Sequence, residues 1–162
     1  MRFSKLIGAS ILVVASVLAS SFTVASAANA AQTGQAEEAQ GGQFTRFDNW
    51  EVHYIAFPST MLQPEIASRY NIRRSGARGL INISVLDTAR EDKPAQRVAL
   101  QGYALNSVGQ RINLQFRRFV EEPAIYYIAE VGHENEDRLR FFITITQGNR
   151  SEELRFTHTF YR

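Results

Sequence analysis

From residue 50 to the C-terminus, apolar side chains recur at every second position, and this alternation restricts the fold more than any other feature of the chain. Successive side chains of an extended strand point to opposite faces, so the pattern predicts strands that each have one face in a core. Glycine, asparagine and proline separate the runs at intervals typical of a β-sandwich. The expected strands cover residues 50–57, 80–86, 97–106, 111–119, 124–131, 139–145 and 153–161, after a short first strand at 44–47.

Residues 58–79 do not alternate and form a connector between the first two long strands. Pro64 suits the first turn of a helix, where its missing N–H has no partner to lose. Leu62, Ile66 and Tyr70 lie four residues apart, which predicts a short helix with one apolar stripe against a sheet edge. This connector is long enough to carry the chain between sheets, whereas the other connections favour antiparallel pairing.

These patterns predict an all-β protein, specifically an immunoglobulin-like antiparallel β-sandwich of about seven strands with one short helical connector. A closed barrel is the alternative, and arginines on the candidate faces disfavour a small outer-membrane barrel. The chain has no cysteine, so no disulfide can hold it together. A domain of this size can bury a sufficient core without one.

The N-terminus has the composition of a secretory signal peptide. Arg2 and Lys5 precede a mostly apolar run at 6–24, which is too diluted by serine and glycine for a typical membrane-spanning helix. We therefore expect export to the periplasm and no integral membrane segment after cleavage. The predicted division is a signal peptide at 1–27 with cleavage after Ala27 or Ala30, a flexible linker at 28–43 and a single domain at 44–162.

Removal of the signal peptide changes the charge balance. The whole chain has 18 basic and 16 acidic residues, and the loss of Arg2 and Lys5 leaves equal numbers. A neutral protein gives no bulk electrostatic reason to bind nucleic acid or an anionic membrane. We expect no nucleic-acid partner.

The sequence contains no recognised catalytic or metal-binding motif. A metal site would need His53, His133 and His158 to converge with a carboxylate, and we expect no suitable acid beside any of them on the same face. The serine-hydrolase elbow G-x-S-x-G and the phosphate-binding P-loop are missing. The acid pairs Glu121–Glu122 and Glu152–Glu153 fall in expected turns, where solvated charge is the ordinary role. We predict no catalytic residue, metal or cofactor.

The connector carries four arginines within ten positions: Arg69, Arg73, Arg74 and Arg78. Arginine binds carboxylate or phosphate through paired donors, and its charge does not titrate away. These four are the candidate binding residues for an anionic ligand. The alternative is that they pair with acids such as Glu65 and Asp87 or keep the surface soluble.

Three segments together resemble a known family. They are HYIAFPSTMLQPEIASRYNIRRSGARGLINISV from His53, YYIAE from Tyr126 and the closing FTHTFY. In combination they resemble an exported bacterial family known as domain of unknown function, number 4426, over nearly the whole of 44–162. The resemblance implies a single periplasmic β-sandwich behind a signal peptide and implies no catalytic residues.

These observations favour an exported, non-enzymatic binding or protein-interaction domain. Its partner would be an envelope protein or an anionic ligand, and the domain would be a monomer or a weak dimer. The exposed edge of a sandwich can accept a partner strand. The alternatives are an envelope-associated hydrolase that uses a histidine and a carboxylate, and a small-ligand carrier, which would need a sizeable internal cavity.

Overall fold

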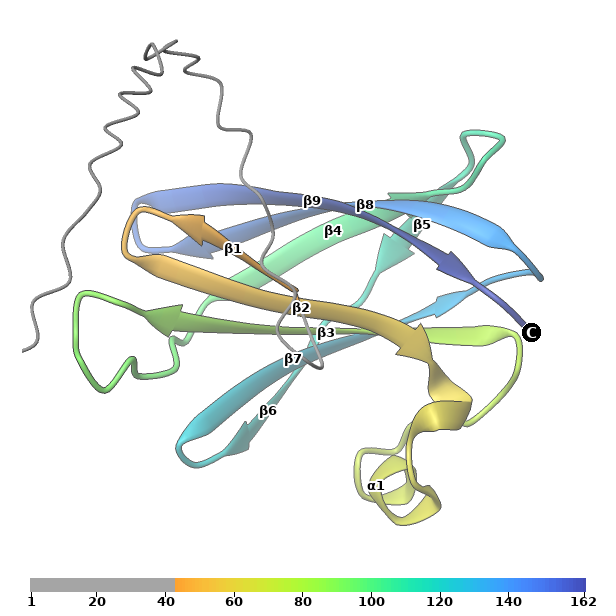
Figure 1. The fold of residues 1–162 in the computed structure, drawn as a ribbon, viewed down its shortest axis with the longest axis horizontal. Coiled ribbons are helices and arrows are strands. Elements are labelled where there is room, and N and C mark those ends of the chain that lie inside the picture. Colours follow the sequence, from red (N-terminus) through yellow and green to blue (C-terminus); the bar gives the residue numbers. More distant parts are fainter. Residues whose placement is uncertain (1–42) are drawn as a thin grey trace, which may run out of the picture. The chain divides into compact units, whose positions relative to one another are not determined.

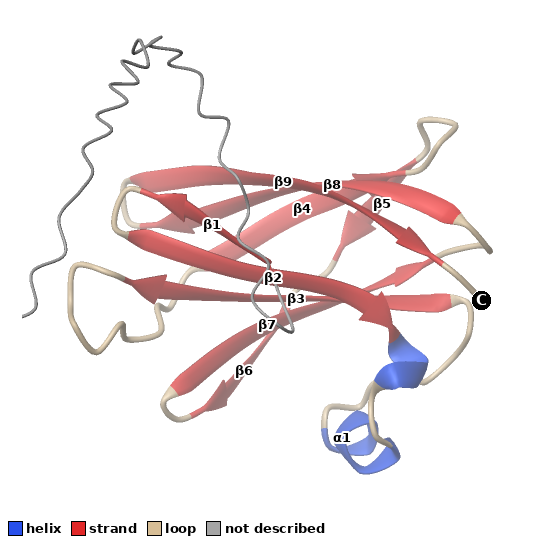
Figure 2. Ribbon diagram, in the orientation of Figure 1, coloured by secondary structure: helices blue, strands red, loops and turns tan. Residues whose placement is uncertain are grey.

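The computed structural model describes residues 43–162, which form two antiparallel sheets that face each other (Figures 1 and 2). This confirms the predicted sandwich. The predicted signal peptide and nearly all of the linker lie outside the described residues. The five-stranded sheet has the order β1 (Gln43–Phe47), β2 (Trp50–Pro58), β3 (Arg78–Asp87), β7 (Ala124–Gly132), β6 (Arg117–Glu121). The four-stranded sheet has the order β5 (Arg111–Leu114), β4 (Ala99–Leu105), β8 (Asp137–Gln147), β9 (Arg150–Phe160).

The strand order is that of the immunoglobulin fold. Strands β2-β3-β7-β6 follow the order ABED, and β5-β4-β8-β9 follow the order C′CFG. Strand β1 is an addition that pairs with the outer edge of β2. The immunoglobulin-like topology expected from the sequence is therefore present, with one extra edge strand.

The expectation that the connector carries the chain between sheets is wrong. It joins β2 to β3, which are antiparallel neighbours in the same sheet from Trp50↔Asp87 to Pro58↔Gly79. The chain changes sheets after β3, after β5 and after β7. The second of these crossings divides the expected strand at 111–119 into β5 and β6, which lie in different sheets.

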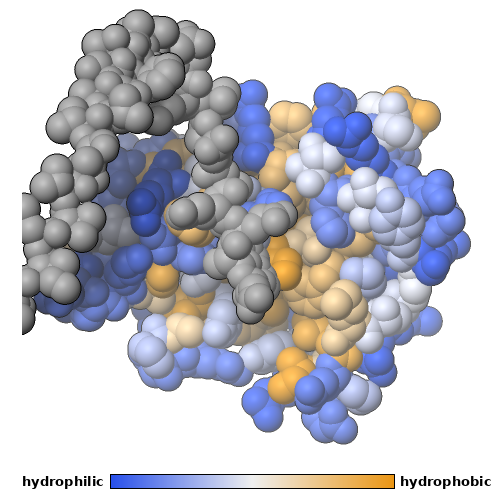
Figure 3. All heavy atoms as spheres, viewed as in Figure 1, coloured by the Kyte–Doolittle hydropathy of each residue, from blue (hydrophilic) through white to orange (hydrophobic). Residues whose placement is uncertain are grey.

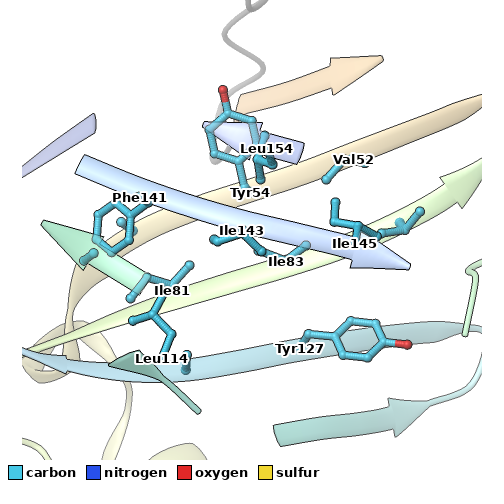
Figure 4. Packing of buried hydrophobic residues seen from close by; sticks show 14 of the residues in the cluster. Val52, Tyr54, Ile81, Ile83, Leu114, Tyr127, Phe141, Ile143, Ile145 and Leu154 are labelled. Atoms are coloured by element: carbon cyan, nitrogen blue, oxygen red, sulfur yellow. The ribbon is translucent and has the colours of Figure 1, made fainter. Parts of the chain in front are cut away.

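The core lies between the sheets and is aliphatic and aromatic (Figure 4). Strands β3 and β8 contribute two rows of fully buried isoleucines from opposite sheets. Each such side chain stabilises the fold by about 1.5–3 kcal/mol through removal from water. Burial of these side chains together explains how a chain of this size can fold without disulfides. The fully buried members include Val52, Ile81, Ile83, Val85, Leu139, Phe141, Ile143 and Ile145.

A second apolar cluster lies on the outer face of the five-stranded sheet, where the connector packs. The connector contains a 3-10 turn, η1 (Ser59–Met61), and one helix, α1 (Pro64–Arg69), which Figure 2 shows in blue. Ala67 and Ile72 of the connector are buried against Leu80 of β3 and Ile128 of β7. The helix therefore packs on the face of the sheet and not, as expected, on its edge. No helix of the described residues is long and apolar enough to cross a membrane.

Candidate functional site

The connector and the five-stranded sheet enclose a cleft on the outer face of that sheet. Strands β3 and β7 supply its floor, the connector forms one wall, and the ends of β2 and β6 complete it. Its volume is about 220 Å³. The lining residues are Phe57, Leu62, Tyr70, Leu80, Asn82, Glu121, Tyr126 and Ile128. Figure 3 shows the molecule in the orientation of Figure 1, with apolar side chains gathered near the centre of the view and hydrophilic ones around them.

Asn82 is the unusual residue of the floor. It lies at the middle of β3, where Ile55 of β2 and Ile128 of β7 are its cross-strand neighbours. Its Oδ1 atom is buried and has no hydrogen-bond partner among the described residues. A buried acceptor without a partner costs about 1–3 kcal/mol of folding free energy. The floor of this mostly apolar cleft therefore includes a buried hydrogen-bond acceptor that no residue of 43–162 satisfies.

A hydrogen bond from Tyr70 to Glu121 closes one side of the cleft, because it ties the end of α1 to the end of β6. This hydrogen bond to Glu121, together with burial and the negative charge of Glu121, raises the pKa of Tyr70 to about 12. The ring of Tyr70 also packs on Phe119, with 4.6 Å between the ring centroids. Glu121 thus has a specific structural partner and is more than the solvated turn residue that the sequence suggested.

Ion pairs and hydrogen bonds fix the connector to the sheet. Arg78 donates to Glu130 at 2.5 Å, and Arg117 donates to the same carboxylate at 3.1 Å. Arg117 also donates to the backbone oxygen of Tyr70 at 2.9 Å, so it reaches from β6 to the connector. Inside the connector, the Ser59 hydroxyl is fully buried and accepts a hydrogen bond from the Ser75 N–H at 2.9 Å. These contacts hold the wall of the cleft in place.

The four arginines predicted to bind an anion do not line the cleft. Arg69 and Arg73 are exposed, and Arg74 donates to the Thr60 backbone oxygen at 2.9 Å. Arg78 pairs with Glu130 rather than with Glu65 or Asp87. Their role toward an anionic ligand stays a prediction.

The expectation that His53 has no acidic partner is wrong. Its Nε2 atom lies 2.8 Å from Glu51 Oε1, and both side chains are on the outer face of β2. Arg46 at 3.0 Å and Lys93 at 3.3 Å also contact this carboxylate, which is almost fully buried. Burial raises the pKa of Glu51, but hydrogen bonds from His53, Arg46 and Lys93 outweigh burial and leave the pKa lowered. The i, i+2 spacing of Glu51 and His53 on one strand was the signal that could have revealed the pair.

His133 and His158 meet at the ring of Phe160. The ring of His133 stacks on Phe160 at 4.6 Å, and the ring of His158 meets Phe160 edge-on at 4.5 Å. Burial, with a smaller contribution from His133, lowers the pKa of His158. Residues 43–162 contain no group of three histidine or acidic side chains placed to hold a metal ion.

Sequence reasoning did not identify the cleft residues Asn82, Tyr70 and Glu121 as a group. The usable signal was Asn82, a polar residue within the most apolar strand. Two pairs of adjacent aromatic residues, Tyr126–Tyr127 and Phe160–Tyr161, are divided between core and surface. Tyr127 and Phe160 are buried, whereas Tyr126 lines the cleft and Tyr161 is 61% exposed.

The fold and the cleft together define an immunoglobulin-like sandwich with a small, mostly apolar cleft on its outer face. Residues 44–162 match the model of the family described as "Domain of unknown function (DUF4426)", and the chain belongs to this family. A crystal structure of a DUF4426 family protein from Pseudomonas aeruginosa PAO1 is 33% identical, with a TM-score of 0.66. The match covers 75% of this chain and 96% of that one.

More distant solved structures share the fold. FetP from uropathogenic Escherichia coli strain F11, expressed in the periplasm, is 9% identical with a TM-score of 0.52, covering 74% of this chain and 93% of FetP. A copper-bound FetP variant is also 9% identical, with a TM-score of 0.51 and coverage of 74% and 89%. At this identity the likeness shows only the fold. No curated protein is similar enough in sequence to be matched.

Proposed function

We propose that this protein is an exported, non-enzymatic interaction domain whose cleft receives an apolar side chain of a partner protein. The same partner would donate an N–H or O–H group to Asn82 Oδ1. The observation that carries the proposal is this buried acceptor without a partner among the described residues, at the floor of a mostly apolar cleft. A donor from the partner would remove the cost of leaving the acceptor unpaired.

The size of the cleft favours a single side chain over a whole small molecule. Its volume of about 220 Å³ lies below the range of about 300–1,000 Å³ that is usual for small-ligand sites. The space between the sheets is filled by the core. These dimensions favour an interaction domain over a small-ligand carrier.

A hydrolase is the second candidate, because a histidine, a carboxylate and an arginine do meet at Glu51. Ser84 of β3 is also the cross-strand neighbour of His53. However, no hydrogen bond joins Ser84 to His53 among the described residues, and these side chains do not line the cleft. This arrangement supports a partly buried ion-pair network better than an activated nucleophile.

Export to the periplasm is part of the proposal and is supported by the signal-like N-terminus. Copper is not part of the proposal, because residues 43–162 lack a set of side chains grouped to hold a metal ion.

A titration with N-acetyl-phenylalaninamide tests the cleft directly, since this probe carries one apolar side chain and two amide groups that can donate hydrogen bonds. We expect weak binding in the millimolar range, with NMR shift changes at the Asn82 side-chain amide and at Tyr126 and Ile128. Asn82→Val should abolish binding, whereas Asn113→Val, the same change at an exposed strand position, should not. Shift changes elsewhere, or equal binding by both variants, would contradict the proposal.

A further inference from the structure

The outer face of the four-stranded sheet concentrates positive charge. Four arginines from three strands point outward here, because side chains alternate between the two faces of each strand. They are Arg111 of β5, Arg138 and Arg140 of β8, and Arg155 of β9. We call these four residues the arginine face. Strands lie about 4.8 Å apart, so the set spans roughly 14 Å across the sheet.

Two aromatic rings hold two of these arginine side chains in place. Tyr103 of β4 and Phe142 of β8 are stacked, with centroids 5.1 Å apart and planes 14° from parallel. The guanidinium of Arg111 lies 3.8 Å from the Tyr103 centroid, and that of Arg155 lies 5.7 Å from the Phe142 centroid. This stacking occupies the flat faces of the guanidinium groups and leaves N–H edges to meet anions. Because the side chains of Arg111 and Arg155 are held in place, they lose less conformational entropy when an anion binds.

Few acids oppose this charge. Glu153 is the one carboxylate on the outward positions of these four strands, and it contacts Arg155 at 2.5 Å. Within residues 43–162, no acidic side chain forms an ion pair with Arg138 or Arg140. The numbers of basic and acidic residues are therefore nearly equal overall, but the charge is unevenly distributed and this face is strongly cationic.

Next to this face, the β4–β5 turn carries an exposed apolar residue. Val108, in the turn, is 84% exposed. In the view of Figure 1, this turn rises beyond β8 and β9, on the side opposite to β3 and β7. A projecting valine gains nothing from a soluble polyanion, but it gains from the apolar region of a bilayer.

We propose that the arginine face and the Val108 turn dock on a membrane surface rich in anionic phospholipid. The outward side chains belong to one sheet and present one broad surface, which suits a flat partner. A hollow of about 210 Å³ lies on this face, lined by Tyr103, Arg111 and Phe142 among others. A stacked nucleic acid is disfavoured because Tyr103 and Phe142 are packed against each other and against guanidinium groups. The face lies on the opposite side of the sandwich from the cleft, so docking leaves the cleft open and does not depend on the proposed function.

Co-sedimentation with vesicles tests this proposal on residues 43–162, which contain both sheets and both apolar clusters. The family model matches residues 44–162, which supports the use of this region as a folding unit. We expect binding to vesicles of equal parts phosphatidylglycerol and phosphatidylcholine at low salt, and none to phosphatidylcholine alone. Binding should disappear at about 1 M salt, where charges are screened beyond about 3 Å.

Charge reversal locates the binding surface. Each basic side chain near an anionic membrane contributes roughly a fivefold gain in affinity. Arg138→Glu with Arg140→Glu should therefore weaken binding by at least about 25-fold. The matched control is Arg90→Glu with Arg118→Glu, which makes the same change of net charge at two exposed positions off this face and should remain within about threefold of wild type. Circular dichroism verifies folding, and Arg138→Gln with Arg140→Gln replaces the first pair if it does not fold.

Three results would overturn the proposal. The first is that the wild-type domain does not bind phosphatidylglycerol vesicles at low salt. The second is that the control pair, or Arg73→Glu with Arg74→Glu in the connector, loses as much affinity as the pair on the arginine face. The third is that heparin binds as tightly as vesicles and Val108→Ser leaves vesicle binding unchanged, which would identify a soluble polyanion as the partner.

Discussion

Replacing Asn82 by valine should stabilise the domain while it abolishes binding in the cleft. The unpaired Oδ1 atom costs about 1–3 kcal/mol, and valine has no polar atom to bury. A β-branched side chain also suits a central strand between two isoleucine neighbours. We expect the free energy of unfolding to rise by about 1–2 kcal/mol.

Urea and thermal unfolding measure this change. Trp50 is the one tryptophan of the chain and is only 2% exposed, so its fluorescence reports loss of the core. For a domain of about 120 residues, ~1 kcal/mol raises the midpoint temperature by about 4 °C, so a rise of about 4–8 °C is expected. The control Asn113→Val changes an exposed residue and should shift the stability by less than about 0.5 kcal/mol.

A lower urea midpoint for Asn82→Val would refute the reasoning, because it would mean that the asparagine stabilises the sheet. A stabilised variant that still binds N-acetyl-phenylalaninamide as well as wild type would refute the role of Oδ1 in recognition. Stabilisation with loss of binding is the pattern expected when a polar group is kept for function at a cost to the fold.

Two further predictions concern the rest of the structure. Gly79→Ala should destabilise the domain by about 1–3 kcal/mol, because a Cβ atom there would lie 2.4 Å from the ring of Phe160; a urea midpoint equal to that of wild type would contradict this. Tyr70 should ionise near pH 12, and because its folded pKa is raised, the stability that it contributes is complete below about pH 10 and is lost as the pH rises toward 12. Tyr70→Phe should remove this loss in unfolding curves between those pH values, and an unchanged alkaline profile would show that the hydrogen bond to Glu121 does not form in solution.

The alternation of apolar residues predicted the sandwich well because one face of each strand must be buried. It failed at 111–119, where β5 ends at Leu114 and β6 begins at Arg117 in the other sheet. Ile112 and Leu114 face the interior from one sheet, and Phe116 packs against the same core between the strands. Periodicity records which residues face a core and carries no information on the sheet that supplies them.

The site was less predictable than the fold. Glu51 and His53 could have been paired from their spacing on one strand, but Arg46 and Lys93 join them only through β-pairing and a loop contact. Similarly, Tyr70 and Glu121 are 51 residues apart and meet because the connector lies on the face of the sheet. Such contacts follow from the packing of elements that are distant in the sequence.

By itself the sequence determined the class of this protein, because period-two burial and the absence of cysteine leave an all-β core as the means of stability. It also determined the family, through residues spread over the whole domain. Only the tertiary structure decided that Asn82 lies unpaired beneath a fixed connector and that four arginines share one face. The reason is that cross-strand neighbours and the direction of each face depend on strand order, which local patterns do not specify.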